Sequence, residues 1–188
     1  VPGSDLTLSH VGINPTRVGI LEILKLMGAD IEVLNAREVG GEPVADLRVR
    51  HAALKGIEVP EALVPLAIDE FPVLFVAACC ASGETRVTGA EELRVKESDR
   101  IQSMVDGLKA LGVSIKGTPD GAVIQGGGPE FRFGSGTVEA HEDHRIAMAF
   151  SVAGLLSVGD VVVNDCANVA TSFPNFVGLA REIGFPLT

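Results

Sequence analysis

The stretch Arg94-Val-Lys-Glu-Ser-Asp-Arg100, which continues directly into residues 101–111, carries the clearest structural signal in this chain. Apolar residues recur at helical spacing after Arg100, so the sequence predicts a helix that buries one face. The apolar positions are Ile101, Met104, Val105, Leu108 and Leu111. The predicted first turn is charged, and helix geometry puts Lys96 and Glu97 near Arg100 on the same surface.

The charges at this helix start run against the usual preference. The positive end of the helix dipole favours acidic side chains, yet Lys96 and Arg100 are cationic. Two cations are favourable at that end if an anion binds against the exposed backbone N–H groups. The alternative is a solvated helix end whose charges form salt bridges with one another. The spacing by itself leaves both interpretations open.

The composition excludes several classes of protein. With 188 residues, 46% of them hydrophobic, and 22 glycines, the chain suits a compact α/β protein with many tight turns. A net charge of −10 and the absence of Trp and Tyr argue against nucleic-acid binding. An anionic substrate would therefore be held by a local cationic cluster within an acidic protein.

The cysteines and the apolar runs indicate a cytoplasmic protein. Cys79, Cys80 and Cys166 are odd in number and have no metal-ligand spacing, so we expect reduced thiols and no metal. The longest apolar run, around Phe71–Ala81, is too short to span a membrane. The chain starts at Val1 rather than at an initiator Met, which is expected of a processed protein or of a piece of a longer one.

The residues before the charged stretch predict a strand–helix–strand–strand order. Leu6–Ile13 is typical of a strand, and Asn14 is a candidate cap for a helix that Pro15 begins and Gly28 ends. Further strands are predicted at Asp30–Leu34 and Ala45–Arg50.

An unusually apolar helix is predicted next, within Ala67–Gly83. Asp69 is a candidate N-cap, Pro72 lies in the tolerated first turn, and the helix body is apolar on every side. Such a helix is buried.

The second half of the chain repeats this order. The elements predicted around and after residues 101–111 are strands at Glu84–Gly89, Ser114–Gly117, Ala122–Gln125, Thr137–Ala140 and Val161–Asp165, a second buried helix at Asp143–Gly154, and a last helix at Thr171–Ile183. The glycine-rich residues 126–136 lack the order of a dinucleotide-binding loop.

Three similar helix ends define an internal repeat. Gly28, Gly112 and Gly184 each end an amphipathic helix, at periods of 84 and 72 residues. We therefore predict an α/β fold of repeated βαβαββ units around shared buried helices, with two units and the first half of a third. If the helix starts share one rim, they form a cationic site with carboxylates that suits a phosphorylated substrate. These starts carry Arg17; Asp69; Lys96, Glu97 and Arg100; Asp143, His144 and Arg145; and Thr171 with Ser172.

Several motifs resemble one enzyme family along the whole chain. They are Glu91-Glu-Leu-Arg-Val-Lys-Glu-Ser-Asp-Arg-Ile101, Asp143-His-Arg-Ile-Ala-Met148, Ile68-Asp-Glu-Phe-Pro72, Asn14-Pro-Thr-Arg17 and Ala170-Thr-Ser-Phe-Pro174. Together they resemble the C-terminal half of the 5-enolpyruvylshikimate-3-phosphate (EPSP) synthase family, also called 3-phosphoshikimate 1-carboxyvinyltransferase. The first two motifs form a highly specific pair.

The resemblance implies an activity and an architecture. The family transfers the enolpyruvyl group of phosphoenolpyruvate to the 5-hydroxyl of shikimate 3-phosphate and releases phosphate, in the shikimate pathway toward chorismate and the aromatic amino acids. It uses no metal and no cofactor. Its fold, an inside-out α/β barrel, has two similar domains. Residues 1–188 are then expected to form a single domain, most of the C-terminal domain, which supplies half the active site and is inactive without its partner, the N-terminal domain.

The resemblance also implies roles for five residues. Asp69 matches the carboxylate that accepts the hydroxyl proton, and Glu97 matches the glutamate that protonates the phosphoenolpyruvate methylene. Lys96 matches a lysine that contacts shikimate 3-phosphate. Arg100 and Arg145 match the arginines that hold phosphoenolpyruvate, which a guanidinium can do bidentately.

Further positions either support the resemblance to the family or depart from the family's usual residue. Asp143 and His144 are expected to orient Arg145. Thr171 stands where many members have lysine, and Glu92 where many have asparagine. Two alternatives remain at this point: a domain like the UDP-N-acetylglucosamine enolpyruvyl transferase, which shares the fold, and a non-catalytic anion-binding module.

Overall fold

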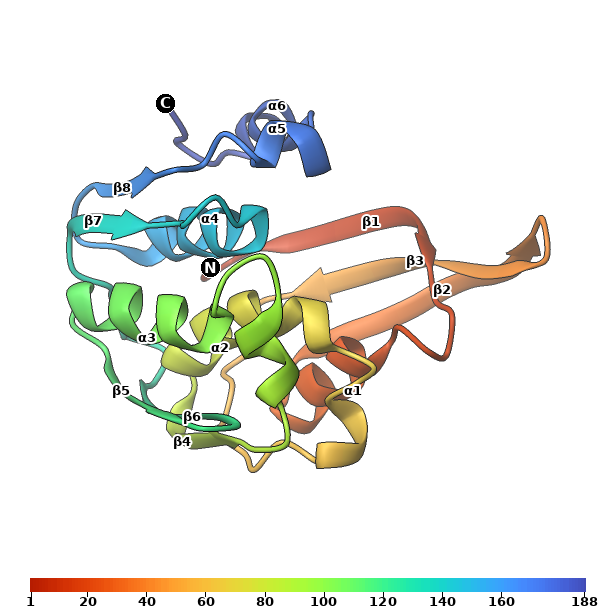
Figure 1. The fold of residues 1–188 in the computed structure, drawn as a ribbon. Helices are drawn as coiled ribbons and strands as arrows, with labels where there is room; N and C mark the ends of the chain where they lie inside the picture. The colour runs from red at the N-terminus through yellow and green to blue at the C-terminus, as the bar shows by residue number, and fades with distance from the viewer.

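The first part of the chain folds into a three-stranded antiparallel sheet in a computed structural model that describes all 188 residues. Strand β3 (Glu42–Arg50) lies between β1 (Asp5–Gly12) and β2 (Asp30–Val39). The alternating pattern of β3 buries Ala45 and Leu47 on one face. Helix α1 (Gly19–Leu26) packs its buried Ile23 into the core, and the β2–β3 hairpin projects away from the helices (Figure 1).

The second sheet repeats the first. Strand β6 (Gly121–Gly127) lies between β4 (Ser82–Val87) and β5 (Ser114–Thr118), again antiparallel. The predicted hairpin around Pro119–Gly121 is confirmed, since β5 and β6 pair on either side of it. A third pair, β7 (Gly136–Glu139) and β8 (Val161–Asn164), is parallel.

The two helices that the sequence predicts to be buried lie between these sheets. They are α2 (Phe71–Cys79) and α4 (His144–Ala153), which contact each other and α3 (Arg100–Ala110). Figure 1 shows them at the centre, between the β4–β5–β6 sheet and the β7–β8 pair. Short 3-10 turns, at Glu61–Leu63, Ile68–Glu70, Glu91–Val95 and Gly154–Leu156, link the larger elements.

Each central helix connects two parallel strands. Residues 54–59 bond to β4 in parallel through the bridges Lys55–Ser82 and Glu58–Arg86, and α2 connects them. Helix α4 makes the same connection between β7 and β8. The repeated α/β unit is therefore confirmed, with one addition: an extra parallel segment precedes the buried helix of the first unit.

The repeat extends to the way the amphipathic helices end. After α1 and α3, and after α6 (Phe176–Glu182), a glycine adopts a left-handed backbone, with φ of +94° at Gly28, +83° at Gly112 and +95° at Gly184. Each glycine and the residue after it donate to helix carbonyls in the same pattern, the Schellman motif. Glycine adopts this conformation without the Cβ clash of other residues.

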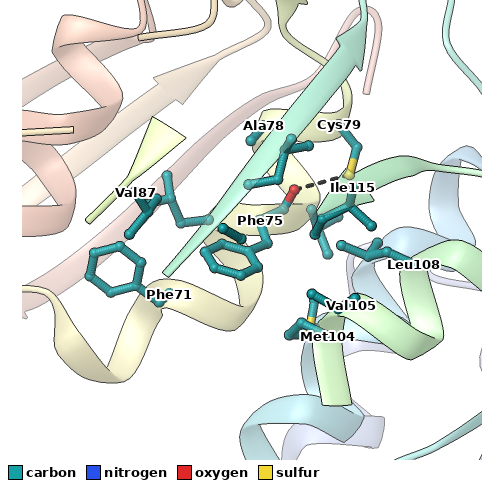
Figure 2. Packing of buried hydrophobic residues seen from close by; sticks show 14 of the residues in the cluster. Phe71, Phe75, Ala78, Cys79, Val87, Met104, Val105, Leu108 and Ile115 are labelled. Carbon is teal, nitrogen blue, oxygen red and sulfur yellow. Dashed lines mark hydrogen bonds between the residues drawn. The ribbon is translucent and has the colours of Figure 1, made fainter. Parts of the chain in front are cut away.

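The core is packed mainly by aliphatic and phenyl side chains from these helices and sheets. Figure 2 shows Phe75 of α2 near Ile115 and Phe71 near Val87, and the Cys79 thiol donates a hydrogen bond to the Phe75 carbonyl oxygen at 3.1 Å. Burial raises the pKa of the Cys79 thiol, so it stays protonated and acts as a small apolar group.

Four local predictions are wrong for identifiable reasons. Asn14 does not cap α1, which begins five residues later; its carboxamide instead accepts from the Thr16 backbone N–H. Asp69 lies in a 3-10 turn and caps nothing. Lys96 and Glu97 precede α3, whose N-cap is Asp99. The single helix predicted at Thr171–Ile183 is divided into two helices, α5 (Val169–Ser172) and α6. The division occurs because Pro174 lacks a backbone N–H and keeps Phe173 extended.

None of the helices is long and apolar enough to cross a membrane.

Helices α3 and α4 approach closely where α3 has no side chain. A Cβ added at Gly107 would lie 2.2 Å from Cζ of Phe150, whose ring is fully buried. We predict that Gly107→Ala lowers the free energy of unfolding by about 1–3 kcal/mol, because the packed ring has little room to move. Urea unfolding at pH 7 measures this.

A matched control is Gly178→Ala in α6. There the new Cβ would make only an ordinary contact, 3.7 Å from Oδ1 of Asn175. Alanine should leave stability unchanged or raise it by up to about 1 kcal/mol, through its better helix propensity. Equal destabilisation by both substitutions would show that the α3–α4 contact is not the cause.

Candidate active site

The starts of three helices meet at one cluster of charged side chains. The 3-10 turn before α2 supplies Asp69 and Glu70. The segment that leads into α3 supplies Glu97, and α3 begins with Arg100. The start of α4 supplies its N-cap Asp143 and Arg145. The segment that leads into α3 is itself fixed to the protein, because Arg94 binds the Asp99 carboxylate at 2.7 Å and the carbonyl oxygens of Thr118 and Pro119.

A buried ion pair joins α3 to α4. The Arg100 side chain is 1% exposed and that of Asp143 is 0% exposed. Nε of Arg100 donates to Oδ2 of Asp143 at 2.8 Å, and Nη2 reaches Oδ1 at 3.4 Å. The Asp143 carboxylate also accepts from the Arg145 backbone N–H at 2.9 Å, which caps α4, and from the Ser98 hydroxyl at 3.1 Å.

The surroundings of Asp143 keep it ionised. Burial works to raise the pKa of Asp143, but the hydrogen bonds and positive charge of Arg100, with the Arg145 N–H and Ser98, outweigh it and hold the pKa below its ordinary value. The backbone before Asp143 is strained, with φ of +53° at His141 and +57° at Glu142. Left-handed residues other than glycine are uncommon and gather at functional sites.

Arg100 holds two further carboxylates besides Asp143. Its Nη1 donates to Oδ1 of Asp69 at 3.2 Å, and its Nη2 donates to Oε2 of Glu97 at 2.5 Å. These two carboxylates lie nearer to solvent, with 35% and 52% of their side chains exposed. One guanidinium thus orders both of the carboxylates for which the family resemblance implies proton transfer.

Arg145 is the accessible arginine of the cluster, with 30% of its side chain exposed. Its Nη1 donates to the Asp69 carbonyl oxygen at 3.0 Å and lies 3.6 Å from Oε1 of Glu70. Its Nη2 lies 3.4 Å from Oδ2 of Asp69. Burial raises the pKa of Glu70, only partly offset by the positive charge of Arg145.

Four of the five predicted site residues therefore lie in one network: Asp69, Glu97, Arg100 and Arg145. Lys96 is separate, because its ammonium binds Glu92, four residues earlier, rather than a member of the network. The anticipated proximity of Glu97 to Arg100 is confirmed, and that of Lys96 to Arg100 is not. His144 makes no side-chain hydrogen bond here, whereas Asp143 fixes the Arg145 backbone.

Other residues depart from the expectation of a shared rim. Arg17 forms no ion pair with the network, although its charge reaches Glu70. Thr171 and Ser172 close α5 instead of opening a helix, and neither binds the network. The sequence patterns assign no role to Glu70, whose one signal is its position directly beside Asp69.

The geometry defines what this cluster can do chemically. Two arginines lie among four carboxylates, so guanidinium groups that can bind a carboxylate or phosphate adjoin groups that can move protons. No group of three or more His, Cys, Asp or Glu side chains is arranged to hold a metal ion.

Comparisons with known proteins agree on one family. The family model described as EPSP synthase (3-phosphoshikimate 1-carboxyvinyltransferase) matches residues 1–179. The 3-phosphoshikimate 1-carboxyvinyltransferase of Methylococcus capsulatus is 64% identical over 186 residues, which is 99% of this chain and 42% of the relative. That of Alkalilimnicola ehrlichii is also 64% identical, over 99% of this chain and 41% of the relative. The chain thus spans about 42% of the length of such relatives.

Solved structures give the same result. The EPSP synthase structure from Acinetobacter baumannii superposes with a TM-score of 0.95 and 54% identity, over 97% of this chain and 42% of that one. The enolpyruvyl transferase NikO from Streptomyces tendae superposes with a TM-score of 0.72 over 96% of this chain and 39% of that one. At 20% identity the NikO comparison shows the shared fold alone.

The buried pair yields a stability prediction. Asp143→Asn leaves the Arg100 charge buried without its main partner, so the free energy of unfolding at pH 7 should fall by roughly 3–5 kcal/mol. Because the folded state lowers the pKa of Asp143, its stabilisation is present above the ordinary value of 3.8 and is lost as pH falls below it. Urea unfolding from pH 7 to pH 2.5 should show the difference between the two proteins shrinking only at the acidic end.

The control for this prediction is Asp160→Asn, an exposed aspartate that makes no side-chain ion pair. It should change stability by less than about 0.5 kcal/mol at every pH. A loss at Asp143→Asn no larger than this control would show that the buried pair does not hold α3 and α4 together.

Proposed function

The chain belongs to the EPSP synthase (3-phosphoshikimate 1-carboxyvinyltransferase) family, and from this membership we propose that it supplies half of an enolpyruvyl-transfer site. The reaction moves the enolpyruvyl group of phosphoenolpyruvate to the 5-hydroxyl of shikimate 3-phosphate and releases phosphate. The single observation that carries the proposal is the network in which Arg100 orders Asp69 and Glu97 beside the accessible Arg145.

The chemistry needs a base and an acid. The hydroxyl oxygen bonds to C2 of phosphoenolpyruvate as the hydroxyl loses its proton, and C3 gains a proton. The C2–O bond to phosphate then breaks as C3 gives up a proton, which restores the double bond. We assign the first proton to Asp69 and the proton at C3 to Glu97, since both carboxylates are partly exposed and fixed by one guanidinium.

The arginines suit the anionic groups of phosphoenolpyruvate. Arg145 offers its exposed guanidinium directly. Arg100 is enclosed, and of its three carboxylates Glu97 is the most exposed. A ligand anion can therefore reach Arg100 most easily by exchanging with Glu97, which would free that carboxylate for proton transfer. Lys96 would contact shikimate 3-phosphate after releasing Glu92.

We also propose that residues 1–188 are most of the C-terminal domain of a two-domain cytoplasmic enzyme whose N-terminal domain completes the site. The charge balance supports this. Four carboxylates surround two arginines in a chain of net charge −10, so two anionic substrates require further cations from outside this chain. No metal, cofactor, nucleic acid or membrane is part of the proposal.

The proposal predicts activity once the site is complete. Joining this chain to the part of the Methylococcus capsulatus relative that it does not cover should give a protein that releases phosphate from phosphoenolpyruvate and shikimate 3-phosphate. In that protein Arg145→Ala should lower kcat/KM by about 10- to 150-fold, the loss of a charged hydrogen bond of about 1.5–3 kcal/mol. The chain by itself should release none.

Two outcomes count against this function. One is absence of turnover in the joined protein under conditions where the unmodified relative is active. The other is phosphate release with UDP-N-acetylglucosamine in place of shikimate 3-phosphate, which would favour the alternative transferase.

The exchange at Arg100 predicts an unusual pair of effects for Glu97→Gln. Turnover in the joined protein should fall by about 100- to 10,000-fold, as expected for loss of a proton-transfer group. Binding of phosphoenolpyruvate, measured by calorimetry, should become tighter, because a neutral amide competes less well for the guanidinium.

The matched control is Glu91→Gln, which removes a nearby exposed negative charge without releasing Arg100. It should change neither turnover nor affinity by more than about twofold, since exposed charges are screened. Weaker phosphoenolpyruvate binding by Glu97→Gln would contradict the exchange.

A further inference from the structure

The Arg145 guanidinium lies against two carboxylates that belong to adjacent residues. Asp69 contacts it through Oδ2, 3.4 Å from Nη2, and through its carbonyl oxygen, 3.0 Å from Nη1. Glu70 contacts it through Oε1, 3.6 Å from Nη1. The 3-10 turn before α2 thus points two consecutive acidic side chains at the start of α4.

Stability does not explain the position of Glu70. Its side chain is 37% exposed, and Arg145 is its one ion-pair partner. Glu70 is the N-cap residue of α2, but its carboxylate makes no capping hydrogen bond. Burial raises the pKa of Glu70, which means that folding disfavours the charged form. The charged groups that face it are Arg145 from α4, Asp69 from its own turn, and Arg17 from the segment before α1.

The Asp69 and Glu70 carboxylates differ in their other contacts and in their part in the proposed reaction. Asp69 also binds Nη1 of Arg100 and, in the proposed reaction, accepts a proton. A protonated Asp69 has no negative charge with which to hold Arg145. Glu70 has no second ion-pair partner, so its contact with Arg145 does not depend on a bond to Arg100.

We infer that Glu70 is a positioning residue, whose carboxylate keeps the Arg145 guanidinium in place while Asp69 is protonated. This inference rests on the proposed function. The consequence is kinetic. In the ground state the Asp69 and Glu70 carboxylates both hold the Arg145 guanidinium, whereas in the transition state, with Asp69 protonated, Glu70 is its main anionic partner. Loss of Glu70 therefore weakens transition-state binding more than ground-state binding.

The test uses the joined protein with Glu70→Gln. We expect kcat to fall about 5- to 20-fold, while KM for phosphoenolpyruvate changes less than about twofold, because the lost contact matters most in the transition state. Glu70→Asp, which keeps the charge on a shorter side chain, should recover part of kcat. In an Arg145→Lys background, Glu70→Gln should have little further effect.

Stability measurements separate this role from a structural one. At pH 7 Glu70→Gln should unfold at the same urea concentration as the parent or at a higher one, since it removes a charge that folding disfavours. The folded state raises the pKa of Glu70, so any gain should vanish at acidic pH, where the parent carboxyl is protonated as well. Glu130→Gln, an exposed acid without an ion pair, is the control and should leave kcat and stability unchanged.

The outcomes distinguish failure of the positioning role of Glu70 from failure of the proposed enolpyruvyl-transfer function. An unchanged kcat, a fall in kcat that tracks a loss of stability, or independent effects of Glu70→Gln and Arg145→Lys would each overturn the positioning role. If the joined protein has no activity at all, the proposed function fails. The contact is then judged by a double-mutant cycle on urea unfolding, in which no coupling between Glu70 and Arg145 overturns the inference and coupling supports the contact.

Discussion

The ion pair between Arg100 and Asp143 is the constraint on which the candidate site depends. Asp143 caps α4 and binds the first residue of α3, so one carboxylate fixes the relative position of two helix starts. Taking both charges out of water costs several kcal/mol each, and their attraction offsets this cost only if the geometry is good and the remaining donors are satisfied. Here further carboxylates satisfy them, and those carboxylates are the groups that the proposed chemistry uses.

The fold explains why the helix starts converge. In each unit the buried helix connects two parallel strands, residues 54–59 with β4 and β7 with β8. The starts of these two helices meet where Arg145 contacts Asp69 and Glu70. The close contact at Gly107 and the repeated glycine turns keep α3 near them. The site is therefore a product of the repeat, in which equivalent helix ends have acquired different side chains.

Periodicity and motif were enough to predict the α/β class, the repeat and the buried helices, and four of the five residues predicted for the site lie in the network. Long-range contacts were not predictable in the same way. The residues around Asp69 do not show that its carboxylate accepts a hydrogen bond from Arg100, 31 positions later, instead of capping a helix. Lys96 pairs with Glu92 because the chain there is a 3-10 turn that precedes the helix. The contact of Glu70 with Arg145 depends on the packing of α4 against the turn before α2, which the local sequence does not show.

The excess of carboxylates over arginines has a consequence for how ligands approach. At distances beyond contact, this half of the site and the acidic chain around it repel an anion; the guanidinium groups attract it only at close range. Dissolved salt screens repulsion between exposed charges over about 8–10 Å. Anion association with this chain should then accelerate as ionic strength rises, the reverse of the usual electrostatic steering. In the proposed two-domain enzyme, the cations that offset this repulsion would come from the N-terminal domain.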